Sequence, residues 1–356
     1  MAPWESTEFD RHEQVCCFAE PSSGLKAIVA IHSTALGPAV GGTRFWPYRE
    51  DRLALDDALR LSRAMSYKCA LAGVPFGGGK AVIIGDPAVL KGRELLHAYG
   101  RYLNRIGTTF CTGEDVGFSV ADCEVIREVS PFVAGTESAG AGDPSIHTAQ
   151  GVFHGLRAVV ETRFSRDDFV GVHVAVQGLG NVGARLCRLL HEAGARLTVA
   201  DVRSDRTEQL ACELGAHIAS ADAIHAVPAD IFAPCALGGV INAQTLPQIQ
   251  AKAIAGAANN QLATASLGEA LRQREILFTP DYVINAGGVI GAVEEVFRTR
   301  GWTQRRLDPI DVRLRQIHSR LLDLFSRAAR ERTTPEATAT RVAQELIAAG
   351  PGAIAA

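Results

Sequence analysis

Two lysines and a run of glycines stand close together in the first quarter of this 356-residue chain. The segment CALAGVPFGGGKAVI places Lys80 directly after three glycines, and Lys68 lies shortly before the proline-bent turn. Two ammonium groups held in one poorly hydrated pocket disfavour each other's charge, so repulsion and desolvation both lower a lysine pKa. A lysine whose pKa approaches neutrality can act as a general base. The residue types alone leave a second interpretation open, namely two surface lysines that flank a turn.

The same segment looks like a phosphate-binding loop, but two of its positions exclude that interpretation. A Walker A loop, G-x-x-x-x-G-K-S/T, requires glycine where this chain has Val74. It also requires serine or threonine after the lysine, where this chain has Ala81. We therefore expect the glycines to allow close approach of substrate and backbone around Lys80.

A second glycine motif has the features of a dinucleotide-binding site. The pattern G-x-G-x-x-G directly follows the apolar run HVAVQ and opens an amphipathic helix. Its glycines allow a tight turn, the approach of a pyrophosphate and close packing of helix on strand. The next apolar run ends in an acid that can accept hydrogen bonds from a ribose diol and repel a 2′-phosphate. The residues predicted to bind NAD are Gly178, Leu179, Gly180, Asn181, Val182, Gly183 and Asp201.

These motifs require two α/β domains. The first part combines a β-rich run at 24–33 with an apolar helix face over 53–69 and a helix that begins near Ser119. Beyond about residue 150, short apolar runs alternate with helical segments, which is typical of a doubly wound parallel sheet. These runs are 173–177, 197–200, 230–234, 253–257 and 275–280, and one amphipathic helix is expected over 309–349. We predict a substrate-binding and catalytic domain over 1–145, an NAD-binding Rossmann domain over 146–320 and a C-terminal helical segment over 321–356.

Composition argues against several classes of partner. The chain is 47% hydrophobic and 21% charged, as in globular proteins, and no apolar run approaches the roughly 20 residues of a membrane helix. A formal net charge of −3 gives no reason to expect binding to nucleic acid or to anionic membranes. The polar N-terminus is not a secretory signal. The eight cysteines form no C-x-x-C pair, and no Cys or His group has metal-ligand spacing. We therefore expect reduced thiols, no metal site and a cytoplasmic protein.

Several motifs, taken in order, resemble those of the amino-acid dehydrogenases for glutamate, leucine, valine and phenylalanine. The resemblance covers about residues 25–300 and is closest to the NAD-dependent phenylalanine dehydrogenases and to the leucine dehydrogenases. The motifs are GPAVGGTRFWPY (37–48), MSYKCALAGVPFGGGKAVI (65–83), TGEDVG (112–117), DPSIHTAQGV (143–152), GLGNVG (178–183), GAANNQL (256–262) and YVINAGGVIGAVEE (282–295).

The resemblance implies a role for each residue that matches a family motif. Lys68 would bind the substrate α-carboxylate together with the backbone around Gly42. Lys80 would be the general acid/base, and Asp115 would share its proton transfers. The implied reaction is reversible oxidative deamination, in which hydride leaves the amino-acid Cα for NAD and water adds to the resulting imine. Collapse of the adduct gives a 2-oxo acid and ammonium.

The resemblance also implies a homo-oligomer, with a mixed sheet in the N-terminal domain and the active site in the cleft between the domains. Near the nicotinamide it places Thr148, the loop at Cys235–Ala236, and Asn285. Asn259 is expected to face both substrate and cofactor, and the adjacent Asn260 is the alternative. We expect Cys235 to pack this loop, because no histidine stands beside it as the partner of a nucleophile.

Three positions bear on the substrate side chain. Glutamate enzymes of the family have a lysine where this chain has Val40, so a buried substrate carboxylate would lack a counter-charge here. Branched-chain enzymes typically carry alanine in place of Gly113 and valine in place of Ala292. Both differences enlarge the predicted pocket and favour L-phenylalanine. A leucine or valine dehydrogenase is the alternative; a catalytically silent NAD-binding protein is disfavoured by the retained lysines and aspartate.

Overall fold

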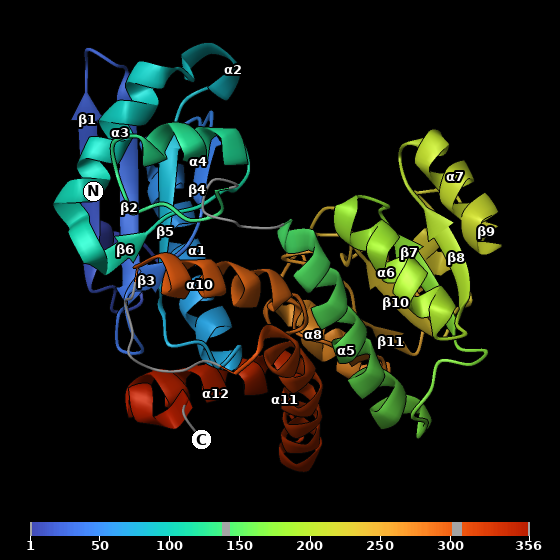
Figure 1. The fold of residues 1–356 in the computed structure, drawn as a ribbon. Helices are drawn as coiled ribbons and strands as arrows, with labels where there is room; N and C mark the ends of the chain where they lie inside the picture. Colours follow the sequence, from blue (N-terminus) through green and yellow to red (C-terminus); the bar gives the residue numbers. More distant parts are fainter. Residues whose placement is uncertain (1, 137–142, 301–307, 355–356) are drawn as a thin grey trace. The chain divides into compact units, whose positions relative to one another are not determined.

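The computed structural model describes residues 2–136, 143–300 and 308–354. The chain divides into two units, seen in Figure 1 in colours that follow the sequence. The first unit comprises Met1–Gly142, Ala292–Arg306 and Val342–Ala356, and the second comprises Asp143–Gly291 and Leu307–Arg341. The units are not contiguous in sequence, because Ala292–Arg306 and Val342–Ala356 group with the first unit; the functional domain boundaries stay a prediction. An amphipathic pattern shows that a helix packs on a core, but not on which core.

The sheet of the first unit is mixed, as predicted. Its order is β1-β2-β5-β3-β6, and β4 pairs with β5. Strands β1, β2 and β5 pair antiparallel, whereas β3 and β4 run parallel to β5, and β6 runs parallel to β3. The strands are β1 Gln14–Glu20, β2 Leu25–Ser33, β3 Ala39–Val40, β4 Thr43–Trp46, β5 Gly77–Ile84 and β6 Phe110–Cys111.

Helices cover both faces of this sheet. Ile28 and Ala30 of β2 pack in the same core cluster as apolar residues of α1, while Val29 and Ile31 pack with residues of α3 and α4. Helix α4 begins after Ser119, the predicted N-cap, whose hydroxyl accepts a hydrogen bond from a backbone N–H of the first turn. The helices are α1 Asp51–Leu71, α2 Pro87–Leu90, α3 Arg93–Ile106 and α4 Val120–Arg127, with short 3-10 turns at Pro3–Glu5 and Gly107–Thr109.

The glycine segment before Lys80 is a strand, which corrects its interpretation as a loop. It forms the start of β5, in the interior of the sheet, and Lys80 pairs in register with Ala30 of β2. A Cβ atom at Gly78 would lie 2.0 Å from the backbone nitrogen of Ser66 in α1. Glycine therefore lets α1 pack directly on the backbone of the strand that carries Lys80.

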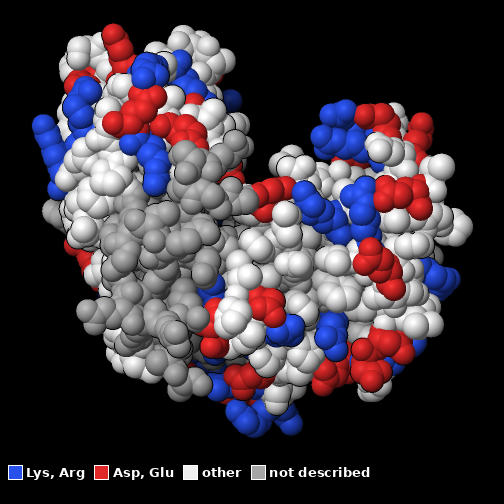
Figure 2. All heavy atoms as spheres, in the orientation of Figure 1, with Lys and Arg blue, Asp and Glu red and all other residues white. Residues whose placement is uncertain are grey.

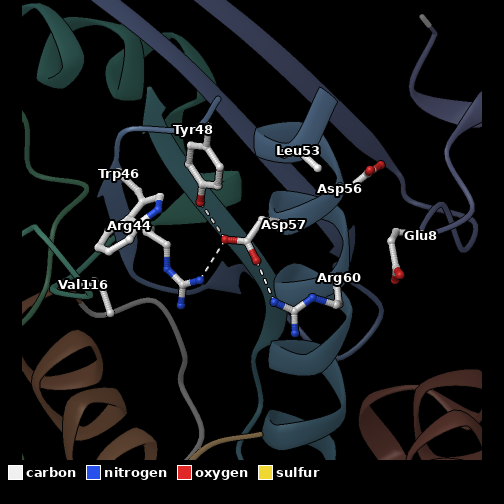
Figure 3. Close-up of a pocket in the computed structure, with 9 residues that line it drawn as sticks. All are labelled: Glu8, Arg44, Trp46, Tyr48, Leu53, Asp56, Asp57, Arg60 and Val116. Carbon is white, nitrogen blue, oxygen red and sulfur yellow. Dashed lines mark hydrogen bonds and ion pairs between the residues drawn. The ribbon is translucent and has the colours of Figure 1, made fainter. Parts of the chain in front are cut away.

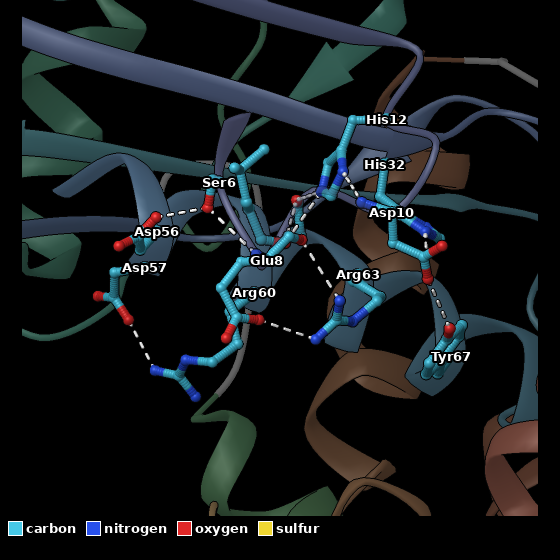
Figure 4. A network of polar contacts seen from close by, with 12 residues as sticks. Ser6, Glu8, Asp10, His12, His32, Asp56, Asp57, Arg60, Arg63 and Tyr67 are labelled. Carbon is cyan, nitrogen blue, oxygen red and sulfur yellow. Dashed lines mark hydrogen bonds and ion pairs between the residues drawn. The ribbon is translucent and has the colours of Figure 1, made fainter. Parts of the chain in front are cut away.

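The segment that precedes β1 lies along α1 (Figure 4). The hydroxyl of Ser6 donates to Asp56 at 2.5 Å, and the carboxylate of Glu8 pairs with Arg63 at 2.9 Å. Both partners belong to α1, the helix whose last turn carries Lys68. These contacts tie the N-terminal segment to the helix that positions a predicted substrate-binding residue.

Two buried histidines contact helix α1. The rings of His12 and His32 meet edge to face with centroids 5.0 Å apart. Nε2 of His12 lies 3.0 Å from both the Leu59 carbonyl oxygen and Ser62 Oγ, and Nδ1 of His32 lies 2.8 Å from Ser66 Oγ. Burial lowers the pKa of both imidazoles, that of His32 to about 4. The pair is therefore held in its neutral form inside the first unit.

The second unit has a fully parallel sheet in the order β12-β11-β10-β7-β8-β9. Counted within the unit, this is 6-5-4-1-2-3, the strand order of a dinucleotide-binding Rossmann sheet. The predicted runs at 173–177, 197–200, 230–234, 253–257 and 275–280 each contain a strand, and the short exposed strand β9 was missed. The strands are β7 His173–Gln177, β8 Arg196–Ala200, β9 His217–Ile218, β10 Ile231–Pro234, β11 Ala253–Ile254 and β12 Leu277–Phe278.

The stretch 309–349, predicted as amphipathic helix, forms two helices, α11 and α12. Arg332, at φ +54°, ends α11 in the left-handed region, and α12 follows after a short break. No helix among the described residues has the length and apolar character to cross a membrane. The helices are α5 Pro144–Phe164, α6 Asn181–Glu192, α7 Ser204–Leu214, α8 Ser266–Gln273, α9 Asp281–Ile284, α10 Gly287–Arg300, α11 Ile310–Glu331 and α12 Pro335–Ala349, with 3-10 turns at Ile224–Ala226, Leu246–Gln248 and Pro351–Ile354.

Candidate active site

The two residues predicted to be catalytic are in direct contact within the first unit. Lys80 is only 6% exposed, and its Nζ lies 3.1 Å from Oδ2 of Asp115. Asp115 follows β6 in a turn that is closed by paired backbone hydrogen bonds with Phe118. A buried strand and a short turn thus bring together two groups that are far apart in the sequence.

Burial and neighbouring charges set the protonation of this pair. Burial lowers the pKa of Lys80 because the ammonium loses its hydration, and this outweighs the opposing attraction of Asp115. Burial acts to raise the pKa of Asp115, but the positive charges of Lys80 and Arg44 outweigh it and lower that pKa. The arrangement therefore favours an ionised carboxylate beside a lysine that releases its proton readily.

Gly42 lets the turn that carries Asp115 come close to the lysine strand. A Cβ atom at this position would lie 2.2 Å from the Glu114 carbonyl oxygen and 3.0 Å from Cβ of Asp115. The carbonyl of Gly42 accepts a hydrogen bond from the backbone nitrogen of Ala81 at 3.3 Å. The backbone around Gly42 therefore contacts both the strand that carries Lys80 and the turn that carries Asp115.

Two residues predicted to line the substrate pocket lie on other segments of the first unit: Val40 on β3 and Gly113 shortly after β6. Val40 is 7% exposed and pairs in register with Gly78 of β5 and Cys111 of β6. Among the described residues, a Cβ atom at Gly113 would meet only the carbonyl oxygen of Ala134, at an ordinary contact distance of 3.5 Å. The described part of the chain therefore leaves room for a side chain at Gly113.

Two further residues predicted to bind substrate lie in the first unit. Lys68 is partly buried in the last turn of α1, whose backbone packs on β5. Ala292 is partly buried on α10. Their places beside the substrate, and the closeness of Lys68 to Lys80, stay predictions.

Sequence reasoning missed Arg44, which contacts the predicted catalytic pair. Its Nε donates to Oδ2 of Asp115 at 3.0 Å, and its charge lowers the pKa of Lys80. Arg44 alternates with the buried residues Thr43 and Phe45 on β4, so its side chain points to the opposite face of the strand. The carboxylate that it contacts there is distant in sequence, and no local pattern indicated it.

Arg44 also reaches a pocket of about 420 Å³ in the first unit (Figure 3). Asp57 of α1 lies at its centre and accepts hydrogen bonds from Arg44, Tyr48 and Arg60. The pocket is lined by Glu8, Arg44, Trp46, Tyr48, Leu53, Asp56, Asp57, Arg60 and Val116.

In the second unit, the predicted dinucleotide loop follows strand β7 at its carboxyl end. Gly178 has φ +91°, and a Cβ atom there would lie 2.7 Å from Cβ of Ala236. A Cβ atom at Gly183 would lie 1.9 Å from the carbonyl oxygen of Gly178. Nothing described lies within 4 Å of a Cβ atom at Gly180, which is the N-cap of α6 and makes no side-chain cap. The backbone N–H groups of Asn181 and Val182 therefore begin the helix where a pyrophosphate can bind.

Asp201 lies at the end of β8 and faces this loop. Its Oδ2 accepts a hydrogen bond from the backbone nitrogen of Leu179 at 2.6 Å, and its Oδ1 accepts one from that of Arg203 at 2.9 Å. Each carboxylate oxygen can accept a further hydrogen bond. Asp201 therefore orients the glycine loop and still has acceptor capacity for a ribose diol.

The segment after β10 also packs against the glycine loop. The backbone nitrogen of Cys235 donates to the Gln177 carbonyl oxygen at 2.7 Å, and its Cβ would lie 3.3 Å from one built at Gly183. Burial raises the pKa of Cys235 to about 11. The thiol therefore stays protonated, which fits a packing role.

The predicted asparagines of the second unit lie together. Nδ2 of Asn285 donates to Oδ1 of Asn259 at 2.7 Å and to the Ala257 carbonyl oxygen at 3.1 Å. Oδ1 of Asn285 is buried without a hydrogen-bond partner among the described residues, so it can accept one from a ligand amide. Asn259 and Asn260 are both exposed, and Asn260 has φ +52°, so the choice between them stays a prediction. Thr148, on α5, uses its hydroxyl to donate to the Pro144 carbonyl oxygen at 2.9 Å.

The described part of the chain shows no metal site and no disulfide. On the face shown in Figure 2, acidic and basic side chains are interspersed. No group of His, Cys, Asp and Glu among the described residues could hold a metal ion. The eight cysteines are free thiols.

Comparisons with known proteins match both units. A family model described as "Glu/Leu/Phe/Val dehydrogenase, dimerisation domain" matches residues 12–130, and one described as "Glutamate/Leucine/Phenylalanine/Valine dehydrogenase" matches residues 202–350. The leucine dehydrogenase of Geobacillus stearothermophilus is 44% identical, over 94% of this chain and 90% of that protein. The phenylalanine dehydrogenase of Lysinibacillus sphaericus is 42% identical, over 94% and 88%. The crystal structure of L-tryptophan dehydrogenase from Nostoc punctiforme superposes with a TM-score of 0.83 at 43% identity, over 95% and 96%.

Proposed function

The chain belongs to the Glu/Leu/Phe/Val dehydrogenase family and is an amino-acid dehydrogenase; we propose that its substrate is L-phenylalanine and its cofactor NAD. The observations that carry the substrate proposal are the room that the described residues leave for a side chain at Gly113 and the buried, uncharged Val40. An aromatic ring fills such a space better than a branched aliphatic chain. A glutamate side chain would find no cation at Val40 to offset the cost of burial.

The residues of the first unit then divide the chemistry. Lys68 binds the α-carboxylate of the substrate. NAD, when bound, accepts the hydride that leaves Cα. Lys80, which releases its proton readily, takes a proton from the water that adds to the imine carbon. Asp115, kept ionised by its two cationic neighbours, receives a proton and returns it to the departing amine. The products are phenylpyruvate, ammonium and NADH.

The second unit supports NAD over NADP. Asp201 already accepts two backbone hydrogen bonds and is therefore fixed at the edge of the glycine loop. A carboxylate in this position accepts hydrogen bonds from the ribose diol and repels a 2′-phosphate. Gly180 supplies the open backbone for the pyrophosphate, and Asn259 and Asn285 supply amide groups for the nicotinamide.

We also propose that the enzyme is a homo-oligomer. Support comes from the family model that matches residues 12–130, whose description names a dimerisation domain. Light scattering coupled to size-exclusion chromatography measures the subunit number. A monomer at micromolar concentration would overturn this part of the proposal.

A comparison of kcat/KM for L-phenylalanine and L-leucine with NAD tests the function. We expect a higher value for phenylalanine, since a hydrophobic pocket separates such substrates by about 1–3 kcal/mol. The similarity to a leucine dehydrogenase favours leucine as the second candidate, and a preference for leucine would replace the substrate. No NADH formation from any L-amino acid, with NAD binding intact, would mean a catalytically silent protein.

A further inference from the structure

One charged group in contact with the predicted catalytic pair takes no part in the proton transfers described so far. We propose that Arg44 is a positioning residue that holds the Asp115 carboxylate against Lys80 and keeps the lysine ready to give up its proton. This inference rests on the proposed roles of Lys80 and Asp115. It adds a requirement that they do not contain, namely a third charge fixed in place by the fold.

The geometry places both cations on the same oxygen of Asp115. Oδ2 lies 3.1 Å from Nζ of Lys80 and 3.0 Å from Nε of Arg44. The carboxylate is therefore fixed from two directions, and its other oxygen makes no hydrogen bond or ion pair within the described part of the chain. The side chains of Arg44 and Asp115 are 22% and 23% exposed, so water screens their interaction only in part. A substrate amine can thus meet a carboxylate whose orientation is already set.

Arg44 is itself held by a second acid. Its terminal NH1 donates to Oδ2 of Asp57 at 2.8 Å, and Oδ2 also accepts from the hydroxyl of Tyr48 at 2.6 Å. Oδ1 of Asp57 accepts from Arg60 at 2.7 Å, and Figure 3 shows these three groups converging on one carboxylate. A planar guanidinium bonded to acids through two of its nitrogens has little freedom to rotate. Asp57 therefore fixes Arg44, which in turn fixes Asp115.

The charges that face Lys80 come from three segments: Asp115 after β6, Arg44 on β4 and Asp57 on α1. The nitrogens of Lys80 and Arg44 share one oxygen neighbour, so they lie within about 6 Å of each other, where like charges in a partly buried site repel strongly. Without Arg44, Asp115 would attract the Lys80 ammonium unopposed. The lysine would then hold its proton to higher pH.

The test uses the full-length enzyme and the pH profile of kcat/KM for oxidative deamination. In Arg44→Met we expect the ascending limb to move up by about one pH unit, because the repulsion on Lys80 is lost. We also expect kcat to fall by about tenfold or more, because Asp115 is no longer oriented. In Arg44→Lys the charge remains but cannot bridge both acids, so kcat should fall while the limb stays near its wild-type position.

Asp57→Asn gives a second test with the opposite sign. Asp57 attracts the Lys80 ammonium, so its neutralisation lowers the pKa of Lys80 and should move the limb to lower pH. Asparagine keeps an oxygen that can accept from Tyr48, so this variant should fold even if Arg44→Met does not. Arg60→Gln is the matched control, because Arg60 contacts Asp57 through the other oxygen and does not touch Asp115.

The outcomes separate this inference from the proposed function. A wild-type profile and kcat in Arg44→Met would overturn the inference, whatever happens to its melting temperature. Limb shifts in the same direction for Arg44→Met and Asp57→Asn would also overturn it. Lys80→Ala with substantial remaining kcat would overturn the proposed function instead, independently of any Arg44 result.

Discussion

Replacing Gly113 with alanine tests the volume argument at the position where the structure leaves room. Within the described part of the chain, the new methyl group would meet only the Ala134 carbonyl oxygen, at 3.5 Å. Gly113 is not among the described glycines with positive φ, so alanine fits the backbone. A Gly→Ala change of this kind alters stability by about 0.4–1 kcal/mol, in the stabilising direction. The substitution should therefore change the substrate pocket and leave the fold intact.

The expected effect on substrate choice is large because the two amino acids respond in opposite directions. A methyl group forced against a bound phenyl ring costs about 1–3 kcal/mol, as in overpacked cores. The same methyl group fills unused space beside leucine and can gain up to about 0.8 kcal/mol. The ratio of kcat/KM for phenylalanine over leucine should therefore fall by roughly one to three orders of magnitude.

Initial rates of NADH formation with each amino acid, measured for wild type and Gly113→Ala, give this ratio. Gly92→Ala is the matched control: nothing described lies within 4 Å of a Cβ atom at Gly92, which is the N-cap of α3. It should leave the ratio unchanged. An unchanged ratio in Gly113→Ala, with the melting temperature retained, would show that Gly113 does not line the substrate pocket. An equal loss for both substrates would point to a displaced backbone instead.

Three further predictions follow from the two sites and from the buried histidines. Lys80→Ala should lower kcat by about 10²-fold or more with an unchanged Kd for NAD, and a loss of NAD affinity would contradict its role. Asp201→Ala should relax the preference for NAD over NADP in kcat/KM; the same cofactor ratio as wild type would count against the placement of this acid. Burial, aided by the charge of His12, lowers the pKa of His32 from 6.5 to about 4. The unfolded chain therefore binds this proton first, so the stability linked to His32 is complete above pH 6.5 and falls as pH drops from 6.5 towards 4, by about 2 kcal/mol at pH 5. Urea unfolding at pH 7.5 and pH 5 should show this loss in wild type and a smaller one in His32→Gln; equal losses would disprove the linkage.

The fold around the predicted dinucleotide site was predictable because its sequence signals are local. The strand, glycine turn, helix and second strand of the motif lie within one short stretch of sequence, and each residue's task is set by its neighbours along the chain. Gly178 makes the tight turn at φ +91°, and Asp201 reaches back to the backbone of Leu179. The alternation of strands and helices likewise predicted the parallel sheet around it.

The glycine segment before Lys80 was interpreted wrongly for a physical reason. Periodicity reveals a strand through side chains that alternate between buried and exposed, and three successive glycines have none to show. Their purpose depends on α1, whose Ser66 nitrogen would lie 2.0 Å from a Cβ at Gly78. Close packing of a helix on a bare backbone is a tertiary fact that no local pattern records.

The charges around Lys80 also depend on tertiary contacts that no local sequence pattern records. Sequence reasoning required a cation to lower the pKa of Lys80 and assigned that task to Lys68, which stands shortly before it in the chain. The structure supplies Arg44, whose bond to Asp115 spans 71 positions. An arginine is always charged, whereas a second lysine in the same place could lose its own proton and with it the repulsion. An arginine held by Asp57 and Asp115 therefore keeps its effect on Lys80 across the whole pH range in which the lysine must act as a base.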